Sequence, residues 1–456
     1  MNFIKGSVRN MPSADNPYIK LWKWCLYGVP LWWVIGLSVF AYHLVALMLF
    51  ASLVYARTRE DQGIYLPLSF WPLFFMSLVH AFSLFIHAGP GNMDRAVAST
   101  YNLSFWVMGW MLIVVMANAF TRRDLRSMLR AFYWVAFITG GLALFVFVMA
   151  LTGKQDISFP SLLYQPFLKI MGRSPLIEYS LWVKPLHYDW FVSSSRPRFT
   201  AFCPYSTATG TLTLILLMML MTWAAVQRKT KNLIFFAVFF LDLLALAMTL
   251  SRTAVVAFIM STVAVFVFQK QRALLWIIVF VFGVLMLAPW IWQLLEWILT
   301  LRPGSTTGRL ELYRYSLQQF EGIDWIIGFG LKPREDSAFV VPIGSHSTYL
   351  SILFKTGIIG VAAFVFFQIQ LLYRWLRFRE QARHHRNLFF LWSGVGGVLI
   401  GMILCLFTGD IDGPQLLAFV YFSIIGIFEG CVHEQKTKTL MRTASRERIL
   451  EREGGV

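Results

Sequence analysis

The chain has 456 residues, of which 57% are hydrophobic and only 14% are charged. An ordinary soluble domain has about 45–50% apolar and roughly 25% charged residues, so this composition excludes a soluble globular protein and predicts a membrane protein. The formal net charge of +17 is concentrated in short runs between apolar stretches, which indicates membrane topology and contact with membrane lipids, and no nucleic-acid partner.

Apolar stretches of spanning length recur along the chain, and about 20 such residues cross the hydrocarbon core as an α-helix. We therefore predict an all-α polytopic membrane protein with about twelve transmembrane helices, forming a single membrane domain of residues 1–456. The predicted spans are 21–37, 39–56, 65–88, 97–120, 131–151, 203–226, 232–250, 253–269, 273–295, 346–372, 388–408 and 415–431.

Basic residues are concentrated in every second connection, as in TRRDLR after the fourth span and RWLRFREQARHHR after the tenth. The positive-inside rule places such connections in the cytoplasm. Both termini are then predicted to be cytoplasmic, with residues 433–456 forming a basic cytoplasmic tail.

Two connections on the opposite side are long, residues 152–202 and 296–345, whereas others, such as GDIDG at 409–413, are short. Long outer loops are where function is expected. The aromatic and proline-rich first loop predicts interfacial helices lying on the membrane. In the second loop, TTGRLELYRYSLQQF predicts an amphipathic helix, capped by Thr306 or Thr307 and with an apolar face formed by Leu310, Tyr313, Leu317 and Phe320.

Five arginines lie in or beside these loops. Arg196 and Arg198 precede the sixth span, Arg252 lies at the outer junction of the seventh and eighth, and Arg309 and Arg314 lie on the predicted loop helix. A guanidinium group stays charged and binds two phosphate oxygens at once, so an arginine cluster at the interface predicts a phosphate site. Contact with lipid headgroups, or pairing with carboxylates, is the alternative reading.

His346 opens the tenth span directly after the second long loop. Because imidazole takes a proton near neutral pH, it is suited to activating a sugar hydroxyl, although a lone histidine also fits a structural hydrogen-bonding role. Lys355 lies about half a turn around the same predicted helix from His346, and we expect it not to share the site.

Asp242 is the one carboxylate well inside a predicted span, where a buried charge is costly. An interhelical hydrogen bond is the favoured interpretation, and a proton relay or cation site the alternative. Among the acids of the outer loops, such as Glu178, Asp189, Asp324, Glu335 and Asp336, no DxD pair that would hold a divalent ion around a diphosphate is recognised. Nucleotide-binding motifs are missing. No metal and no cofactor are therefore predicted.

Four segments occur in a fixed order between about residues 195 and 375: RFTAFCPYSTATG, TLSRTAVV, TTGRLELYRYSLQQFEGIDWIIGFGL and GSHSTYLSILFKTGIIG. With this order and these loop sizes, the chain resembles the bacterial O-antigen ligase and O-antigen (polysaccharide) polymerase family. The resemblance implies a glycosyltransferase C-like fold in the bacterial inner (cytoplasmic) membrane, with a periplasmic active site.

The implied reaction is the metal-independent, inverting transfer of a glycan from an undecaprenyl-diphosphate-linked donor to an acceptor. The acceptor is a growing O-antigen or exopolysaccharide glycan for a polymerase, or lipid A-core of lipopolysaccharide for a ligase. The family's histidine matches His346, which would act as the base or position the acceptor hydroxyl. The donor diphosphate would be bound by Arg198 and Arg252, with Arg196, Arg309 and Arg314 as further candidates and with Tyr349 and Asp242 in support.

Two positions depart from the family pattern. Ser347 follows the histidine where asparagine is common, and Ala201 stands where many members have glycine. The first departure favours a polymerase over a ligase. Other polysaccharide-assembly proteins are possible partners. A transporter or flippase of lipid-linked oligosaccharide is the alternative function, and a structural partner in an envelope-assembly complex is a third.

Overall fold

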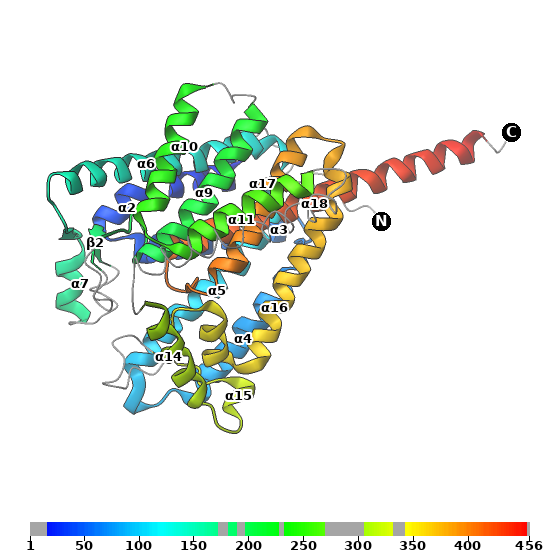
Figure 1. The fold of residues 1–456 in the computed structure, drawn as a ribbon. Helices are drawn as coiled ribbons and strands as arrows, with labels where there is room; N and C mark the ends of the chain where they lie inside the picture. The colour runs from blue at the N-terminus through cyan, green and yellow to red at the C-terminus, as the bar shows by residue number, and fades with distance from the viewer. Residues whose placement is uncertain are drawn as a thin grey trace, which may run out of the picture.

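The computed structural model describes residues 16–171, 181–188, 197–227, 232–269, 305–331 and 343–453. Within these ranges nine helices are long and apolar enough to cross a membrane (Figure 1). The predicted all-α polytopic membrane fold is therefore confirmed, and the predicted span 273–295 lies outside the described residues. The nine are α3 (Ser38–Arg59), α4 (Phe70–His87), α5 (Met93–Ala119), α6 (Leu125–Leu151), α9 (Ser206–Gln227), α11 (Arg252–Gln269), α16 (Thr348–Arg383), α17 (Arg386–Cys405) and α18 (Gln415–Glu453).

Two predicted spans differ from the observed helices. Residues 21–37 do not form one helix. The helix is interrupted at Gly28, which separates α1 (Pro17–Tyr27) from α2 (Val29–Ile35), and Pro30 lies in the first turn of α2. The missing amide hydrogen of proline is tolerated there but not in a helix interior. The span 232–250 is represented by α10 (Leu233–Met248), which has 16 residues and is about 24 Å long at 1.5 Å per residue.

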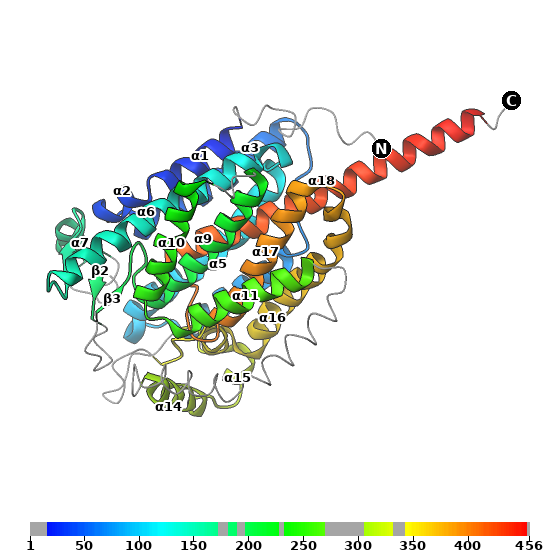
Figure 2. The ribbon, with the colours of Figure 1, turned by 45° about the horizontal axis from the view of Figure 1, so that its top comes forward.

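The centre of the bundle is formed by α9 and α18 (Figure 2). Helix α9 contacts α6, α10, α11, α17 and α18, and α18 packs along α5. Small residues permit the close approach of α5 and α18: a Cβ atom at Gly426 would lie 2.7 Å from the Cβ of Met116, and one at Gly109 would meet the ring of Phe422. Glycine at such crossings is typical of membrane helices, whose association depends on close packing.

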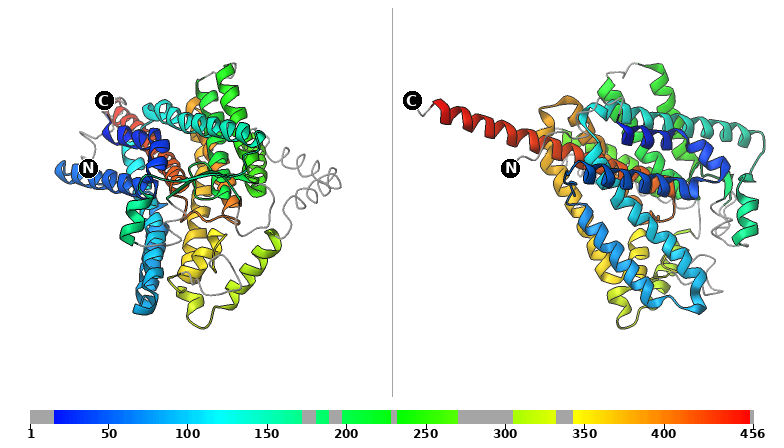
Figure 3. Two further views of the ribbon diagram at one scale, coloured as in Figure 1. Left: turned by 90° about the vertical axis from the view of Figure 1, so that its left-hand side faces the viewer. Right: turned by 180° about the vertical axis from the view of Figure 1, so that it is seen from behind.

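The bundle has two distinct ends. At one end, Asn16 donates a side-chain hydrogen bond to the carbonyl of Ala119 at 2.8 Å, and the amide of Arg122 donates to Glu434 at 3.1 Å. The C-terminal part of α18 extends from this end, whereas α14 (Ser305–Gln318) and α15 (Asp324–Ile327) lie at the far side of the molecule (Figures 1 and 3). The two long loops therefore share the end opposite to the C-terminal helix extension.

The described part of the first long loop contains β-structure as well as a helix. Strands β1 (Ile157–Pro160), β2 (Trp182–His187) and β3 (Arg198–Phe199) form an antiparallel sheet in that order, and α7 (Tyr164–Met171) follows β1. Of the helices predicted for this loop, the described residues contain α7, and its predicted place on the membrane interface stays a prediction. Strand pairing satisfies backbone groups that a proline-containing segment cannot pair within a helix, and it places Arg198 beside His187.

The predicted helix of the second long loop is observed as α14, and its predicted apolar face was right in part: Phe320, just after the helix, is buried and Tyr313 is half-buried. Leu310 and Leu317 are 61% and 41% exposed, whereas Leu312 and Ser316 are buried. Ser316 is accommodated because its hydroxyl donates to the carbonyl of Leu312 at 2.6 Å and accepts from the amide of Gly344 at 2.9 Å. The predicted caps, Thr306 and Thr307, lie inside the helix, which starts at Ser305.

Candidate active site

His346 is held between two segments that are distant in the sequence. Its amide donates to the Asp410 carboxylate at 3.1 Å, and its carbonyl accepts from the Tyr313 hydroxyl at 2.7 Å. Its backbone has a φ of 63°, a left-handed conformation that ordinary side chains rarely adopt. Ser347, the next residue, caps α16 by accepting from the amide of Leu350 at 3.4 Å.

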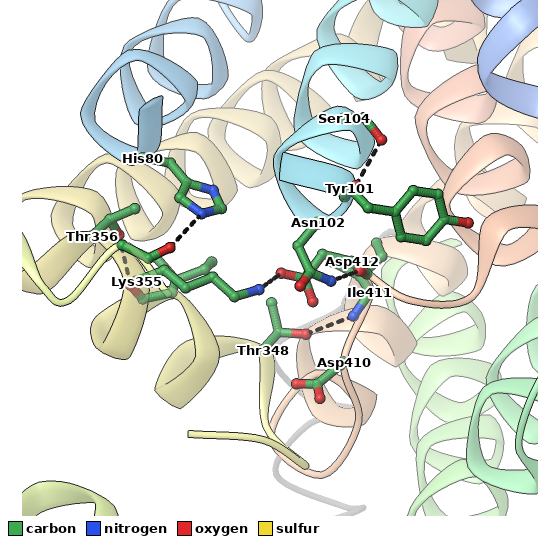
Figure 4. Close-up of polar contacts among 12 residues, drawn as sticks. His80, Tyr101, Asn102, Ser104, Thr348, Lys355, Thr356, Asp410, Ile411 and Asp412 are labelled. Carbon is green, nitrogen blue, oxygen red and sulfur yellow. Dashed lines mark hydrogen bonds and ion pairs between the residues drawn. The ribbon is translucent and has the colours of Figure 1, made fainter. Parts of the chain in front are cut away.

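Residues 406–414, which connect α17 and α18, pack against the segment that contains His346. The Thr348 hydroxyl donates to the carbonyl of Gly409 at 2.7 Å and accepts from the amide of Ile411 at 3.1 Å. The Tyr205 hydroxyl, just before α9, donates to the carbonyl of Asp410 at 2.8 Å. The start of α16, the start of α9 and this connection are thereby joined around Asp410. Figure 4 shows Thr348 of α16 beside Asp410 and Ile411 of the connection.

Asp412 of the same connection forms an ion pair with Lys355, and the two side chains are 2% and 0% exposed. Asn102 of α5 donates from its side chain to the carbonyl of Asp412 at 2.5 Å, and Figure 4 shows the three side chains converging from three elements. The expectation that Lys355 does not share the site of His346 stays a prediction, and the structure links the two residues through Asp412 and Asp410 of one connection. The helical angle was counted from His346, which lies before the helix in a left-handed conformation, so helical geometry does not relate the two residues.

Helix α16 is interrupted directly after Lys355. Gly357 has a φ of 62° and a ψ of −165°, and the carbonyls of Phe354 and Lys355 accept from the amides of Phe329 and Gly330 at 2.8 and 3.0 Å. The second long loop thus takes over hydrogen bonds that a continuous helix would make internally. Residues 348–356 form a short half-helix fixed to the loop at one end and to His346 at the other.

Arg198 and Arg252 both belong to the surroundings of the turn between α10 and α11. Arg198 is 2% exposed, and its Nε donates to the carbonyl of Thr249, the C-cap of α10, at 2.7 Å. Arg252 begins α11 and is half-buried. The same turn packs on α9, because a Cβ at Gly210 would lie 3.0 Å from that of Ser251. Arg196 lies outside the described residues.

The two arginines of α14 have different surroundings. Arg309 is half-buried, one turn before Tyr313, and its positive charge lowers the pKa of Tyr313 against the larger, opposite effect of burial, which raises that pKa to about 12; the Asp410 carboxylate raises it further. Arg314 is exposed. Arg309 therefore borders the His346 site, whereas Arg314 points elsewhere.

An apolar groove of about 330 Å³ opens beside His346, between α14 and α16. Tyr349 forms part of its wall, with its hydroxyl donating to Gln368 at 2.9 Å and its ring centroid 4.6 Å from that of Phe407. The groove is lined by Tyr313, Leu317, Ser347, Tyr349, Leu350, Leu353, Ile358, Val361 and Phe407.

Asp242 lies on α10, away from these contacts, and is fully buried. Neither carboxylate oxygen has a hydrogen-bond partner among the described residues. The predicted interhelical hydrogen bond of Asp242 is therefore not found among those residues. Helix α6 packs closely here, since a Cβ at Gly140 would lie 2.8 Å from that of Leu241.

Asp410 and Asp412 were missed as site residues. They carry a DxD spacing in the outer connection GDIDG, so the prediction that the outer loops hold no such pair was wrong. The available signal was two acids in a five-residue connection between apolar spans. Their carboxylates face different protein partners, His346 and Lys355. Within the described ranges, no group of three or more His, Cys, Asp or Glu side chains is placed to hold a metal ion.

The fold and the site define a multi-pass membrane protein with a histidine-centred polar site at one end of the bundle, beside an apolar groove. Residues 235–365 match the family model of the O-antigen ligases. The match includes Arg252, Arg309, His346 and Lys355, and it confirms the family resemblance and indicates ligase-type glycan transfer in general. No curated protein matches the chain.

Proposed function

We propose that this protein transfers a glycan from an undecaprenyl-diphosphate-linked donor to the hydroxyl of an acceptor glycan, at the periplasmic face of a bacterial inner membrane. The observation that carries the proposal is the position of His346, which is held by Tyr313 and Asp410 and is adjacent in sequence to the groove residue Ser347. A base beside a lipid-sized groove suits a substrate that has a sugar at one end and a hydrocarbon chain at the other.

The groove supports a lipid-linked donor. Its lining is almost entirely apolar and is shared by α14 and the spanning helix α16, so it suits the first isoprene units of a polyprenyl chain. The half-buried Arg309 lies next to the groove residue Tyr313 and is placed to bind the diphosphate. Arg252 is the second phosphate candidate, and Arg198, whose Nε binds the carbonyl of Thr249, positions the turn that carries Arg252.

In the proposed reaction, His346 accepts the proton of the acceptor hydroxyl while that oxygen attacks the anomeric carbon of the donor sugar. The bond from that carbon to the diphosphate oxygen breaks, and the lipid diphosphate leaves with the electron pair. Attack opposite the leaving group inverts the anomeric configuration. Arginine charges stabilise the negative charge that develops on the diphosphate, a role that needs no metal ion.

The acceptor decides between the two reactions of this family. We favour a polymerase, which adds the glycan to another lipid-linked repeat unit, because Ser347 follows His346 where asparagine is common. A ligase would instead transfer the finished chain to lipid A-core. In either case we place both termini in the cytoplasm, which puts the His346 end of the bundle in the periplasm.

The test is glycan transfer in cells that lack the chain and are complemented with His346→Ala, Arg252→Ala or Arg309→Ala. The exposed Arg314→Ala is the matched control. We expect transfer to fall at least about a hundredfold for His346→Ala with normal amounts of protein in the membrane. Accumulated single repeat units would identify a polymerase, and full-length lipid-linked chains a ligase. Normal transfer by all variants would refute the proposal.

The buried carboxyl group of Asp242, which has no hydrogen-bond partner among the described residues, favours a second candidate, a flippase of lipid-linked oligosaccharide coupled to proton movement. The full-length protein in liposomes separates the two functions. A flippase moves labelled donor between leaflets and loses this activity in Asp242→Asn, whereas a transferase forms new glycosidic bonds without a proton gradient.

A further inference from the structure

The Lys355–Asp412 ion pair is almost completely buried in the protein. Its two side chains are 0% and 2% exposed, and desolvating two charges offsets most or all of their attraction. Apolar side chains of similar size would fill the same space at comparable stability. A buried ion pair in such a place is therefore better explained by a requirement for one particular geometry.

The pair joins the parts of the molecule that hold His346. Lys355 ends the half-helix 348–356, and its carbonyl accepts from the amide of Gly330 in the second long loop. Asp412 belongs to the connection whose Asp410 carboxylate accepts from the amide of His346. The ion pair is thus a side-chain link between the half-helix, the loop and this connection.

The other contacts to the connection are made mostly through its backbone. Asn102 donates to the carbonyl of Asp412, Tyr205 to that of Asp410, and Thr348 to that of Gly409. Backbone contacts of this kind limit the path of the chain but do not select the carboxylate orientation. The charge-assisted hydrogen bond from Lys355 to the Asp412 carboxylate does select it.

We infer that Lys355 and Asp412 are positioning residues for His346: their ion pair fixes the 406–414 connection so that the Asp410 carboxylate, which accepts from the amide of His346, holds the histidine in its left-handed conformation beside the groove. The inference rests on the proposed function. Neither residue is required to touch the substrate, because both act through the connection.

The test compares four variants of the full-length protein in liposomes, using lipid-linked oligosaccharide extracted from cells that lack the chain. Lys355→Met with Asp412→Leu removes both charges, Lys355→Asp with Asp412→Lys exchanges them, and Lys355→Arg keeps the charge. The control replaces the exposed ion pair of the same helix, Glu380→Gln with Arg383→Gln; in the native chain its Nη1–Oε1 distance is 2.9 Å. Thermal unfolding, kcat and KM are measured for each.

We expect the neutral double variant to unfold within a few degrees of the native protein, while its kcat falls at least about tenfold and its KM for donor changes less than about threefold. The exchanged pair and Lys355→Arg should recover most of this loss in kcat, and the exposed-pair control should be unaffected. Should the neutral variant fail to fold, the exchanged pair and Lys355→Arg still test the inference, because both variants retain opposite charges at positions 355 and 412.

A kcat within twofold of the native value in the neutral variant, or no recovery in either charge-retaining variant, would overturn the inference. A failure of the proposed function is recognised separately, because His346→Ala would then retain native transfer in the same assay. In that case the effect of the ion pair would be measured on whatever activity the native protein has.

Discussion

His346 adopts a backbone conformation with a φ of 63°, which costs an ordinary residue about 1–3 kcal/mol. Two hydrogen bonds to its backbone hold it there, one from Tyr313 and one to Asp410. Strain of this kind persists only where the surroundings determine the conformation. The backbone conformation and its two partners therefore direct the imidazole, and substitutions at the partners are expected to act on His346.

Tyr313→Phe should lower the transfer rate about tenfold without changing its pH dependence near neutral pH. The hydrogen bond to the His346 carbonyl requires a protonated hydroxyl, and burial raises the pKa of Tyr313 to about 12, above the usual value of about 10 in an unfolded chain. The stabilisation is thus complete below about pH 10 and is lost as the pH rises through about 12.

Rates of the native protein and Tyr313→Phe between about pH 6 and pH 9 check this expectation. Two parallel profiles, displaced by a constant factor, are the expected result. A profile whose shape changes in the variant would contradict the assigned role of the hydroxyl, and so would an undiminished rate. Arg314→Ala, which alters an exposed position on the same helix, serves as the control.

At the scale of elements, the interruption of α16 at Gly357 organises the site. The interruption frees two carbonyls, which accept from the amides of Phe329 and Gly330, and the Ser83 hydroxyl donates to the carbonyl of Gly328 at 3.1 Å. Helix α4, the second long loop and the half-helix are therefore assembled around one glycine. A glycine inside an apolar helical stretch is compatible with an unbroken helix, so the sequence alone did not predict that α16 is interrupted at Gly357.

Gly357→Ala should destabilise the protein by at least about 1–3 kcal/mol and reduce transfer. The left-handed φ is unfavourable for alanine, and its Cβ would collide with the backbone of Ile326. The matched control is Gly141→Ala on α6, where a Cβ meets no atom within 4 Å and where helix propensity favours alanine by about 1 kcal/mol. Thermal unfolding in detergent measures both, and equal melting temperatures for the two variants would contradict the proposed break.

At the scale of the whole molecule, the bundle of helices has two ends that differ in structure. The polar site and the apolar groove lie together at the end that carries α14 and α15. The groove is formed by a loop helix and a spanning helix, so its shape depends on how the second long loop is docked on the bundle. Tyr313 both lines the groove and donates to the His346 carbonyl, so under the proposed function lipid binding and the placement of His346 are linked through this residue.

Val361→Trp should fill the groove and raise the KM for a long-chain polyprenyl donor about tenfold, equivalent to about 1.4 kcal/mol. The KM for a donor with a short lipid chain should change much less, because a short chain occupies less of the groove. Val365→Trp, at a 37% exposed position one turn further along α16, is the control. Equal effects on both donors would show that the groove does not bind the lipid.

The sequence by itself determined the class of the protein and the positions of most described helices, because spanning length and apolarity are local properties of consecutive residues. It also indicated His346, Arg252 and Arg309, since each stands at the junction of an apolar span or on a periodic loop helix. The ordered motifs then indicated the family, which the match over residues 235–365 confirms.

Only the tertiary structure decided how the site is built. Tyr313 and Asp410 are 33 and 64 residues from His346, and Lys355 is 57 residues from Asp412, so no local pattern relates them. The break at Gly357, the small antiparallel sheet and the buried face of α14 likewise depend on contacts between distant segments. Periodicity describes how a residue is oriented within its own element, whereas the contacts of a site depend on how separate elements pack together.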